Sequence, residues 1–414
     1  MGKIIIIGGG ISGLCSAYYL VKEGHQVTVI DRGGISGGTS FINAGYITPS
    51  HFMSIAAPGM ITKGLKWMFD STSPLYIKPR LEIDFIKWAW LFKKSATSKR
   101  VAASVGILKE LNLKSRDLYD QMFASSDFDF HYERKGLLMV YTSHKGEEEE
   151  RALANRAVNE GLEVKCLNKE DLKITQPGFS DDVLGAVHYE CDGHITPDQF
   201  MVNLKKWLIE KGADFQLHQE VVDVVASGNK ITEVKTDKDS YLCSDVVLAA
   251  GSWTFSLAKK LGIYIPIQGG KGYSMDVKRE TYISLPAILT EAKVAVTPMN
   301  GFTRFAGTME FSGNNNYIRK ERVNAIADAV HKYYNNLEIN REERNSALSG
   351  LRPVSPDGLP YIGKTSKYNN LTIASGHAMM GFSLGPITGK LVQELISAEK
   401  PSVNLTPLDP ERFK

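Results

Sequence analysis

The stretch "KIIIIGGGISGLCSAYYL", residues 3–20, decides the fold of this chain. Its first residues, Lys3–Ile7, form a short β-branched apolar run, which is typical of a strand buried on both faces. The glycines that follow have the spacing G-x-G-x-x-G, and we expect a helix over residues 11–23. The segment "HQVTVIDR" then predicts a second strand that ends at Asp31. This order of strand, glycine turn, helix, strand and acid predicts a dinucleotide-binding unit.

Each part of the unit has a physical role toward a dinucleotide. Gly8 permits the tight turn, Gly10 lets the backbone approach a pyrophosphate, and Gly13 lets the helix pack closely on the strand. The helix N-terminus favours the negative phosphates, and the acid accepts hydrogen bonds from a ribose hydroxyl. By itself the motif admits NAD and FAD equally. The predicted cofactor contacts here are Gly8, Gly10, Ile11, Ser12, Gly13, Asp31 and Arg32.

Composition places the chain among globular enzymes. Of its 414 residues, 43% are hydrophobic and 23% are charged. The 49 basic side chains nearly balance the 46 acidic ones, and the net charge is +3. A balance this close to neutral has no basic stripe for nucleic acid, so we expect no nucleic-acid partner.

Cysteine spacing and the apolar runs indicate the cellular compartment. Cys15, Cys166, Cys191 and Cys243 show no CxxC spacing, which favours free thiols in a reducing cytoplasm and predicts no metal site. The first residues lack a signal-peptide pattern, and the apolar runs are too short to span a bilayer. We therefore expect a cytoplasmic enzyme, and contact with the inner face of the cell membrane stays open.

The later segments predict a discontinuous nucleotide domain. Strands are expected near 136–141, 186–190 and 245–251, a meander precedes the last of these, and another strand at 370–377 precedes a terminal helix. The predicted class is α/β (α+β), with a Rossmann-like FAD-binding domain and a strand-rich antiparallel substrate domain. The FAD-binding domain is assigned to 1–50, 140–260 and 345–414, and the substrate or cap domain to 51–139 and 261–344. Because a nicotinamide dehydrogenase more often keeps this fold contiguous, the discontinuity favours a flavoprotein.

Several separate motifs carry a resemblance to a known family. They are "GGGISGLCSAYYLVKEGHQVTVIDR", "TSFINAGYITPS", "AAPGMITKGLKWMF", "GGKGYSM", "SGLRPVSPDGLPYIGKT" and "ASGHAMMGFSLGPITGKLVQELI". Together they resemble the D-amino-acid oxidase/glycine oxidase superfamily of FAD-dependent oxidoreductases from near the start of the chain to residue 397. The segments "KGLKWMF", "KGYS" and "GLRPVSPDG" are most similar to its bacterial D-amino-acid dehydrogenase branch.

The resemblance implies oxidation of a Cα–N bond. In that family the α-hydrogen of the amino acid leaves as hydride to flavin N5, and the imino acid is hydrolysed to a 2-oxo acid and ammonia. D-Proline or D-hydroxyproline would leave a cyclic imine instead. Two alternatives stay open: a glycine/sarcosine-type amine oxidase that uses oxygen, and a non-amino-acid flavin-binding or tRNA-modifying flavoprotein. Stereochemistry rests on the resemblance alone.

The same resemblance implies further FAD contacts. They lie in the loop after the second strand, at a distant strand end, and in the closing segment. No cysteine lies in the closing segment, so we expect FAD to be bound non-covalently. The implied residues are Thr39, Ser40, Asn43, Ala44, Gly45, Val222 with its neighbour Val221, Gly251, Ser252, Gly376, Met380, Gly381, Phe382 and Ser383.

The candidate catalytic residues are Arg352, Tyr273 and His377. By resemblance Arg352 binds the substrate carboxylate, which suits the rigid bidentate fork of an arginine. Tyr273 contacts substrate or cofactor, with core or surface support as an equal alternative. His377 packs against or orients the flavin, because hydride transfer from a neutral amine needs no general base. Lys271, Arg304, Lys293 and Thr297 are weaker candidates for the same pocket, and a supporting role is an equal alternative for them.

The segment 53–94 combines aromatic residues with lysines. Such a combination is typical of a helix at a membrane interface, and packing of the aromatics in a helical cap is the alternative. A dehydrogenase of this family passes its electrons onward, so a quinone or a redox protein is the expected acceptor. The residues concerned are Lys63, Lys66, Trp67, Phe85, Lys87, Trp88, Trp90, Phe92, Lys93 and Lys94.

Overall fold

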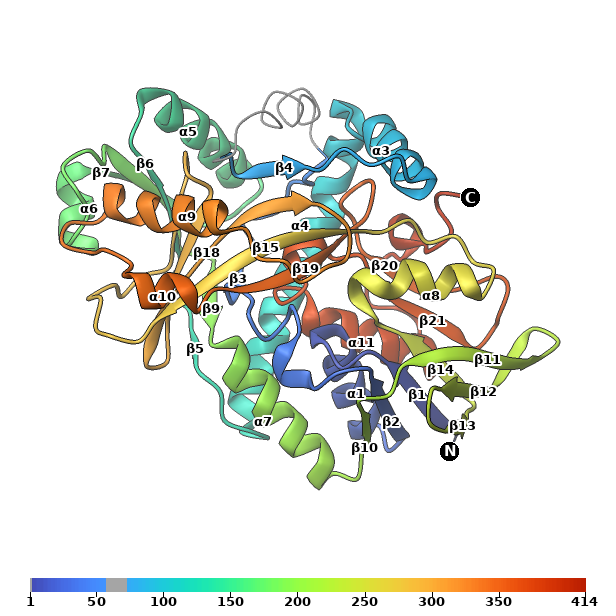
Figure 1. The fold of residues 1–414 in the computed structure, drawn as a ribbon. Coiled ribbons are helices and arrows are strands. Elements are labelled where there is room, and N and C mark those ends of the chain that lie inside the picture. The colour runs from blue at the N-terminus through green and yellow to red at the C-terminus, as the bar shows by residue number, and fades with distance from the viewer. Residues whose placement is uncertain (1, 57–72) are drawn as a thin grey trace.

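The computed structural model of the chain describes residues 2–56 and 73–414, and its centre is a six-stranded sheet (Figure 1). The first strand pairs in parallel on both sides, because its run of isoleucines is buried on both faces. The sheet order is β10 (Asp214–Leu217), β2 (Gln26–Asp31), β1 (Lys3–Ile7), β14 (Asp245–Leu248), β21 (Leu371–Ser375) and β20 (Tyr361–Lys364). Only the pairing of β20 with β21 is antiparallel.

Helices from distant parts of the sequence pack together against this sheet. The helix α1 (Ile11–Lys22) lies against α11 (Gly385–Ile396), and α7 (Pro197–Glu210) packs beside α1. The long helix α4 (Ser98–Ser125) contacts α11 from the other side. A Cβ at Gly389 would lie 2.4 Å from the Cys15 carbonyl oxygen, so the glycine allows the two helices to approach closely. The end of the chain therefore completes the layer that the opening motif begins.

A larger, mostly antiparallel sheet lies over this unit (Figure 1). Its helices are α5 (His144–Asn159), α6 (Lys169–Thr175), α9 (Lys320–Tyr333) and α10 (Arg341–Asn345), and α9 packs on its central strands. The strand order is β19 (Leu348–Val354), β15 (Gln268–Val277), β18 (Phe302–Phe311), β17 (Val294–Met299), β16 (Ala287–Leu289), β6 (Leu137–Tyr141), β8 (Gly185–Tyr189) and β7 (Val164–Asn168), with β4 (Leu75–Ile77) beside β18.

Two small sheets and two further helices complete the described part of the chain. The first small sheet is the meander β11 (Val221–Ser227), β12 (Lys230–Thr236) and β13 (Ser240–Leu242). The second consists of β3 (Tyr46–Ile47), β9 (Gly193–Ile195) and β5 (Tyr132–Glu133). The helices are α3 (Ile83–Ser95) and α8 (Thr254–Lys260).

The predicted fold class is confirmed. Several strands and one helix, however, pack with a different sheet or layer from the one that the predicted domain segments gave them. The six-stranded sheet draws on the three predicted segments 1–50, 140–260 and 345–414. However, β6, β8, β7 and β19 pair within the larger sheet, although most of their residues were assigned to the FAD-binding domain. The helix α4 packs on α11, although it was assigned to the cap. These departures arise because strand pairing and helix packing join residues far apart in the sequence.

Two observations concern the segment predicted to contact a membrane. Within residues 2–56 and 73–414, no helix is both long and apolar enough to cross a bilayer. Lys63, Lys66 and Trp67 lie outside the described residues.

Candidate active site

A cavity of about 760 Å³ lies between the two main sheets, at the carboxyl ends of β1, β2, β14 and β21. Its volume is in the usual range of cofactor sites, and its position is where open parallel sheets bind their ligands. Many of the predicted residues line it, from both ends of the chain. They are Gly8, Gly10, Ile11, Ser12, Asp31, Arg32, Thr39, Ser40, Asn43, Gly251, Ser252, Arg352, His377, Gly381 and Phe382.

The glycine turn has the close contacts that its sequence predicts. Gly8 has a φ of +109°, and a Cβ there would lie 2.5 Å from the Ala249 carbonyl oxygen. A Cβ at Gly13 would lie 1.9 Å from the Gly8 carbonyl oxygen, so Gly13 supports the turn from behind and does not line the cavity. The Asp31 carboxylate accepts hydrogen bonds of 2.8 Å from the amides of Gly9 and Gly33. Asp31 thereby holds the turn in shape beside the cavity.

The loop after β2 is tied to the helix N-terminus and to the larger sheet. The Ile11 amide donates to Ser40 Oγ at 3.0 Å, and the Leu351 amide donates to Thr39 Oγ1 at 2.9 Å. Ala44 and Gly45 do not line the cavity. Their carbonyl oxygens accept from Thr297 Oγ1 at 2.8 Å and from the Ile195 amide at 2.9 Å, so they anchor the end of the loop.

Arg304 supports this loop from below. Its guanidinium forms a bidentate ion pair with Asp276, with distances of 2.8 and 2.9 Å, and is almost fully buried. The same group donates to the carbonyl oxygens of Phe41 at 3.1 Å and Asn43 at 2.9 Å. Of the two alternatives for Arg304, the structure therefore favours support of the cofactor loop over direct contact.

Gly251 and Ser252, just after β14, line the cavity. The Ser252 hydroxyl donates to the Leu351 carbonyl at 2.9 Å, and the Arg32 guanidinium stacks on the Trp253 ring at 3.9 Å. Val221 lines the cavity, whereas the Val222 side chain points outward and is 41% exposed. Successive strand residues face opposite ways, so only one of the two valines can face inward.

The closing segment brings Gly381 and Phe382 to the cavity. Its other predicted contacts, Gly376, Met380 and Ser383, lie behind the lining. Gly376 sits against the Tyr361 ring, and Ser383 Oγ donates to Asn112 Oδ1 at 2.8 Å. These residues fix the turn that carries the lining residues.

His377 is buried and neutral. Burial lowers its pKa to about 4, and its Nε2 lies 2.8 Å from Thr388 Oγ1. The Thr388 hydroxyl already donates its proton to the Leu384 carbonyl, so Nε2 of His377 must carry the hydrogen and donate to Thr388. This arrangement holds the ring in place and agrees with an orienting role.

Arg352 lies on the cavity wall without an acidic partner. Its guanidinium donates to the Thr308 carbonyl at 2.6 Å, and no carboxylate pairs with it among residues 2–56 and 73–414. Burial lowers its pKa to about 10, which leaves the group charged at neutral pH. A Cβ at Gly272 would lie 2.3 Å from this guanidinium, so the glycine leaves the space it occupies.

A β-bulge positions the Thr308 carbonyl oxygen that accepts the hydrogen bond from Arg352. Lys271 pairs with Glu310 and Tyr273 pairs with Gly307, so β18 has one extra residue opposite β15, and Thr308 in this bulge has a φ of 67°. An L-residue in this conformation is strained, and such strain gathers where a backbone group must be aimed. The bulge turns the Thr308 carbonyl toward the guanidinium of Arg352. Because this carbonyl accepts only one N–H group, the other N–H groups of Arg352 can bind an anion in the cavity.

Tyr273 lies away from the cavity lining. Its hydroxyl donates to Glu310 Oε2 at 2.7 Å, and Lys271 Nζ lies 3.2 Å from Glu310 Oε1, with both charged groups buried. Strand alternation places Lys271 and Tyr273 on the face of β15 opposite Gly272. Thr297 anchors Ala44, and Lys293 is exposed at the turn before β17. None of these four residues is brought to the cavity.

Sequence reasoning missed several lining residues. Gly350, Leu351 and Pro353 of β19 line the cavity beside Arg352, and Trp253 stacks on Arg32. The motif "SGLRP" offered a signal for the first three, because it surrounds the arginine. The Trp253 contact depends on a fold that brings β2 and β14 together.

Comparison with known proteins identifies the family. Residues 3–395 match the protein family described as FAD dependent oxidoreductase. The chain belongs to this family. Its cofactor is FAD, and the residues fit that group: the glycine turn, in which a Cβ at Gly8 would strike the backbone, lines one part of the cavity, and Arg352 lines another.

Relatives of this FAD-dependent oxidoreductase extend over its full length. It is 30% identical to a protein named D-amino acid dehydrogenase from Neisseria meningitidis over 423 aligned residues, covering 100% of both chains. It is also 30% identical to one of the same name from Helicobacter pylori, covering 95% of this chain and 94% of the relative.

Solved structures share the fold of this oxidoreductase. Glycine oxidase from Geobacillus kaustophilus superimposes with a TM-score of 0.79 at 19% identity, covering 100% of both chains. L-Proline dehydrogenase from P. horikoshii gives 0.74 at 21% identity, covering 99% of this chain and 97% of that one. Identities this low establish the common architecture only.

Proposed function

We propose that this FAD-dependent oxidoreductase is a dehydrogenase that oxidises D-amino acids to imino acids. The observation that carries the proposal is Arg352, a half-buried cation on the cavity wall without an acidic partner among the described residues. A charge that is partly removed from water without a counter-ion is costly, and the carboxylate of an amino acid would complete it. The relatives at 30% identity, named D-amino acid dehydrogenase, support the D configuration and the dehydrogenase reaction.

The residues of the chain divide the work between binding and orientation. Arg352 holds the substrate carboxylate through two parallel N–H groups, which fixes the direction of the α-carbon. His377 stays neutral and holds the turn that bears Gly381 and Phe382. FAD held in this cavity would supply the acceptor for the hydride that leaves the α-carbon. The imino acid is then hydrolysed to a 2-oxo acid and ammonia, unless it is cyclic.

Substitution of Arg352 tests this assignment. Truncating one partner of a buried, hydrogen-bonded ion pair costs about 2–5 kcal/mol, which corresponds to about 30-fold or more. We expect Arg352→Lys to lower kcat/KM for D-amino acids by at least that factor, while the visible spectrum of bound FAD is retained. Arg279→Gln, which removes an exposed arginine paired with Glu343 on the outer side of the protein, is the control. Full turnover in Arg352→Ala would refute the carboxylate role.

For the electron acceptor we propose a membrane quinone, reached through the outer face of α3. Trp88 on its inner side donates to the Val354 carbonyl at 3.0 Å, two residues from Arg352. Ile83, Ile86 and Trp90 are 69%, 51% and 58% exposed, and exposed lysines lie among and after them. An apolar stripe with flanking lysines suits a surface of anionic lipids. This proposal places the enzyme at the inner face of the cell membrane.

The oxidase alternative differs in how the reduced enzyme meets oxygen. A glycine- or sarcosine-type oxidase would return its electrons to oxygen quickly, whereas the proposed dehydrogenase would do so slowly. Stopped-flow mixing of the reduced enzyme with air separates the two.

A further inference from the structure

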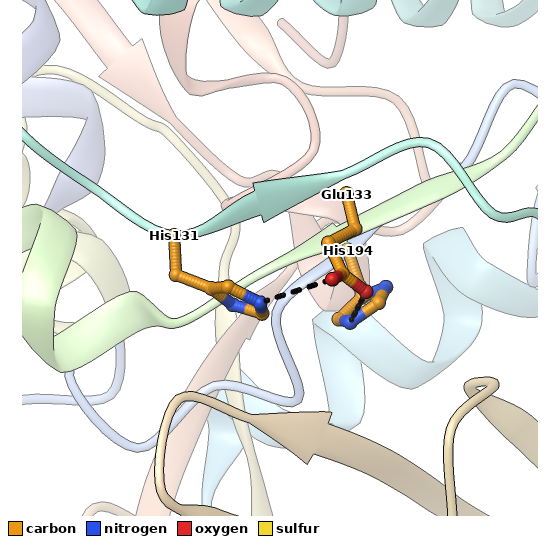
Figure 2. A group of neighbouring side chains, drawn as sticks. All are labelled: His131, Glu133 and His194. Atoms are coloured by element: carbon orange, nitrogen blue, oxygen red, sulfur yellow. Dashed lines mark ion pairs between the residues drawn. The ribbon is translucent and has the colours of Figure 1, made fainter.

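Three side chains with metal-binding atoms meet on the small sheet of β3, β9 and β5, away from the flavin cavity (Figure 2). In this sheet Glu133 lies directly opposite His194, and the Thr196 amide donates to the His131 carbonyl at 3.3 Å. Alternate residues of paired strands share a face, so His131, Glu133 and His194 point the same way. Their ligand atoms all lie within 4.8 Å of one another.

The distances between these ligand atoms are too long for hydrogen bonds between the side chains, and they suit a small cation bound among them. His131 Nε2 lies 3.7 Å from Glu133 Oε1, and His194 Nε2 lies 3.5 Å from Glu133 Oε2. Hydrogen bonds would be shorter, near 2.9 Å. Two ligand atoms at about 2.1 Å from a tetrahedral Zn²⁺ lie roughly 3.4 Å apart. The two pairs joined by dashed lines in Figure 2, each between a histidine nitrogen and a different oxygen of Glu133, are therefore separated by nearly the length of one edge of a zinc site.

His194 supplies an independent observation. The residue is 0% exposed, and within the described part of the chain neither of its ring nitrogens makes a hydrogen bond of normal geometry, although the Pro298 carbonyl lies nearby. An imidazole that is buried without well-formed hydrogen bonds is unfavourable, and a metal ion bound at Nε2 would compensate for this.

His131 is oriented as metal-bound histidines usually are. Its Nδ1 lies 2.9 Å from Thr196 Oγ1, and that hydroxyl accepts from the Asn300 amide at 2.9 Å. With Nδ1–H donating to the threonine, the lone pair of Nε2 faces Glu133. A partner on the remote nitrogen fixes the tautomer that binds a metal.

We propose that His131, Glu133 and His194 form a site for a divalent cation of the zinc class. Two imidazoles and one carboxylate are three of the four ligands of a tetrahedral Zn²⁺, and water would take the fourth position. A second cavity, of about 380 Å³, is lined by His131 together with Gln199 and Asn300, so it borders the proposed site. The prediction of no metal site was based on the spacing of the cysteines, and this group contains histidines and a carboxylate instead.

The site would clamp strands that support the flavin loop. It joins the segment before β5 to β9, and the Ile195 amide of β9 donates to the Gly45 carbonyl at 2.9 Å. Gly45 ends the loop that lines the FAD cavity through Asn43. Metal binding would therefore raise the stability of the folded holoenzyme, because only the folded chain brings the three ligands together.

Lys135 is the competing cation. Its Nζ lies 2.9 Å from Glu133 Oε2, and the side chain is 50% exposed, so it can swing away into solvent. If the carboxylate serves a metal, removal of this lysine strengthens metal binding. If Glu133 serves only as the partner of Lys135, the same removal gives no metal binding.

Zinc titration of the FAD-loaded protein tests the site. After treatment with a chelator and dialysis, we expect one Zn²⁺ per chain by calorimetry and by metal analysis, with a rise in Tm. Glu133→Gln and His131→Ala should weaken Zn²⁺ binding by at least about 100-fold and abolish the rise in Tm. Thr196→Val, which removes the orienting hydroxyl, should weaken it by about 10- to 100-fold. Lys135→Met should tighten it.

The matched control is His144→Ala. His144 is 93% exposed and pairs only with Glu147 in the described residues, so it represents adventitious zinc binding at the surface. Binding that is unchanged in His144→Ala and lost in Glu133→Gln supports the proposal. Wild-type protein without a bound Zn²⁺, or equal affinity in Glu133→Gln and wild type, overturns it.

Discussion

His377, in the turn beside the cofactor cavity, makes the free energy of unfolding depend on pH in the acid range. Burial lowers its pKa to about 4 from 6.5, so between these values the unfolded chain binds a proton that the folded protein does not. Stability contributed by the neutral ring is complete above pH 6.5 and is lost as the pH falls toward 4. The slope is about 1.4 kcal/mol per pH unit for one proton.

The free energy of unfolding falls as the pH is lowered from 6.5 to 4. We expect His377→Gln to reduce the slope of this fall by the contribution of about one proton. The glutamine amide can still donate to Thr388, so the turn is retained. Urea unfolding at a series of pH values measures the slope, and His51, whose pKa burial also lowers to about 4, accounts for part of what remains. An unchanged slope would show that His377 is protonated in the folded protein.

Arg304 acts at the scale of an element, because it fastens a loop to a strand. It connects Asp276 of β15 with the carbonyl oxygens of Phe41 and Asn43. Hydrogen bonds from a charged group contribute about 1.5–3 kcal/mol, or about 10- to 150-fold in a binding constant. Arg304→Gln should raise the dissociation constant for FAD by that factor in a fluorescence titration. The same Arg279→Gln control should bind FAD as wild type does.

The outer face of α3 is the element that would meet the membrane. Each exposed isoleucine or tryptophan that enters the interface gains about 1.5–3 kcal/mol, so a charge there should lower vesicle binding by about 10-fold or more. We expect this loss for Ile86→Glu and Trp90→Glu on vesicles of anionic lipid, with turnover on a soluble dye unchanged. Leu242→Glu alters an equally open residue on β13 and should have no effect. Wild-type binding by both α3 variants would exclude this surface.

Elements were predictable where one physical rule decides them. The strand β1, the glycine turn and α1 follow from a buried apolar run and from glycines that leave no room for a side chain, and the structure has them as expected. The direction of a side chain across a strand was not predictable, because it depends on pairing register. Tyr273 and Val222 face away from the cavity for this reason. Their neighbours face the other way: Val221 lines the cavity, and Gly272 lies against the guanidinium of Arg352.

At the scale of the whole molecule, the cavity is assembled from segments that lie far apart in the sequence. Gly8 and Phe382 line the same space, and the two sheets meet around it. The motifs indicated the segments, but not how β6, β8 and β7 join the larger sheet. The group of His131, Glu133 and His194 likewise depends on the pairing of β5 with β9, although the alternation in "HYE" and "HIT" carries a local signal.

The most direct test of the central claim is anaerobic reduction of the bound FAD by paired D- and L-amino acids. We predict that D-amino acids bleach the flavin absorbance, that the L-enantiomers do not, and that a quinone restores the colour faster than air does. Arg352→Lys should need far higher concentrations for the same bleaching. Bleaching by glycine or sarcosine but by no D-amino acid, with rapid recovery in air, would contradict the account.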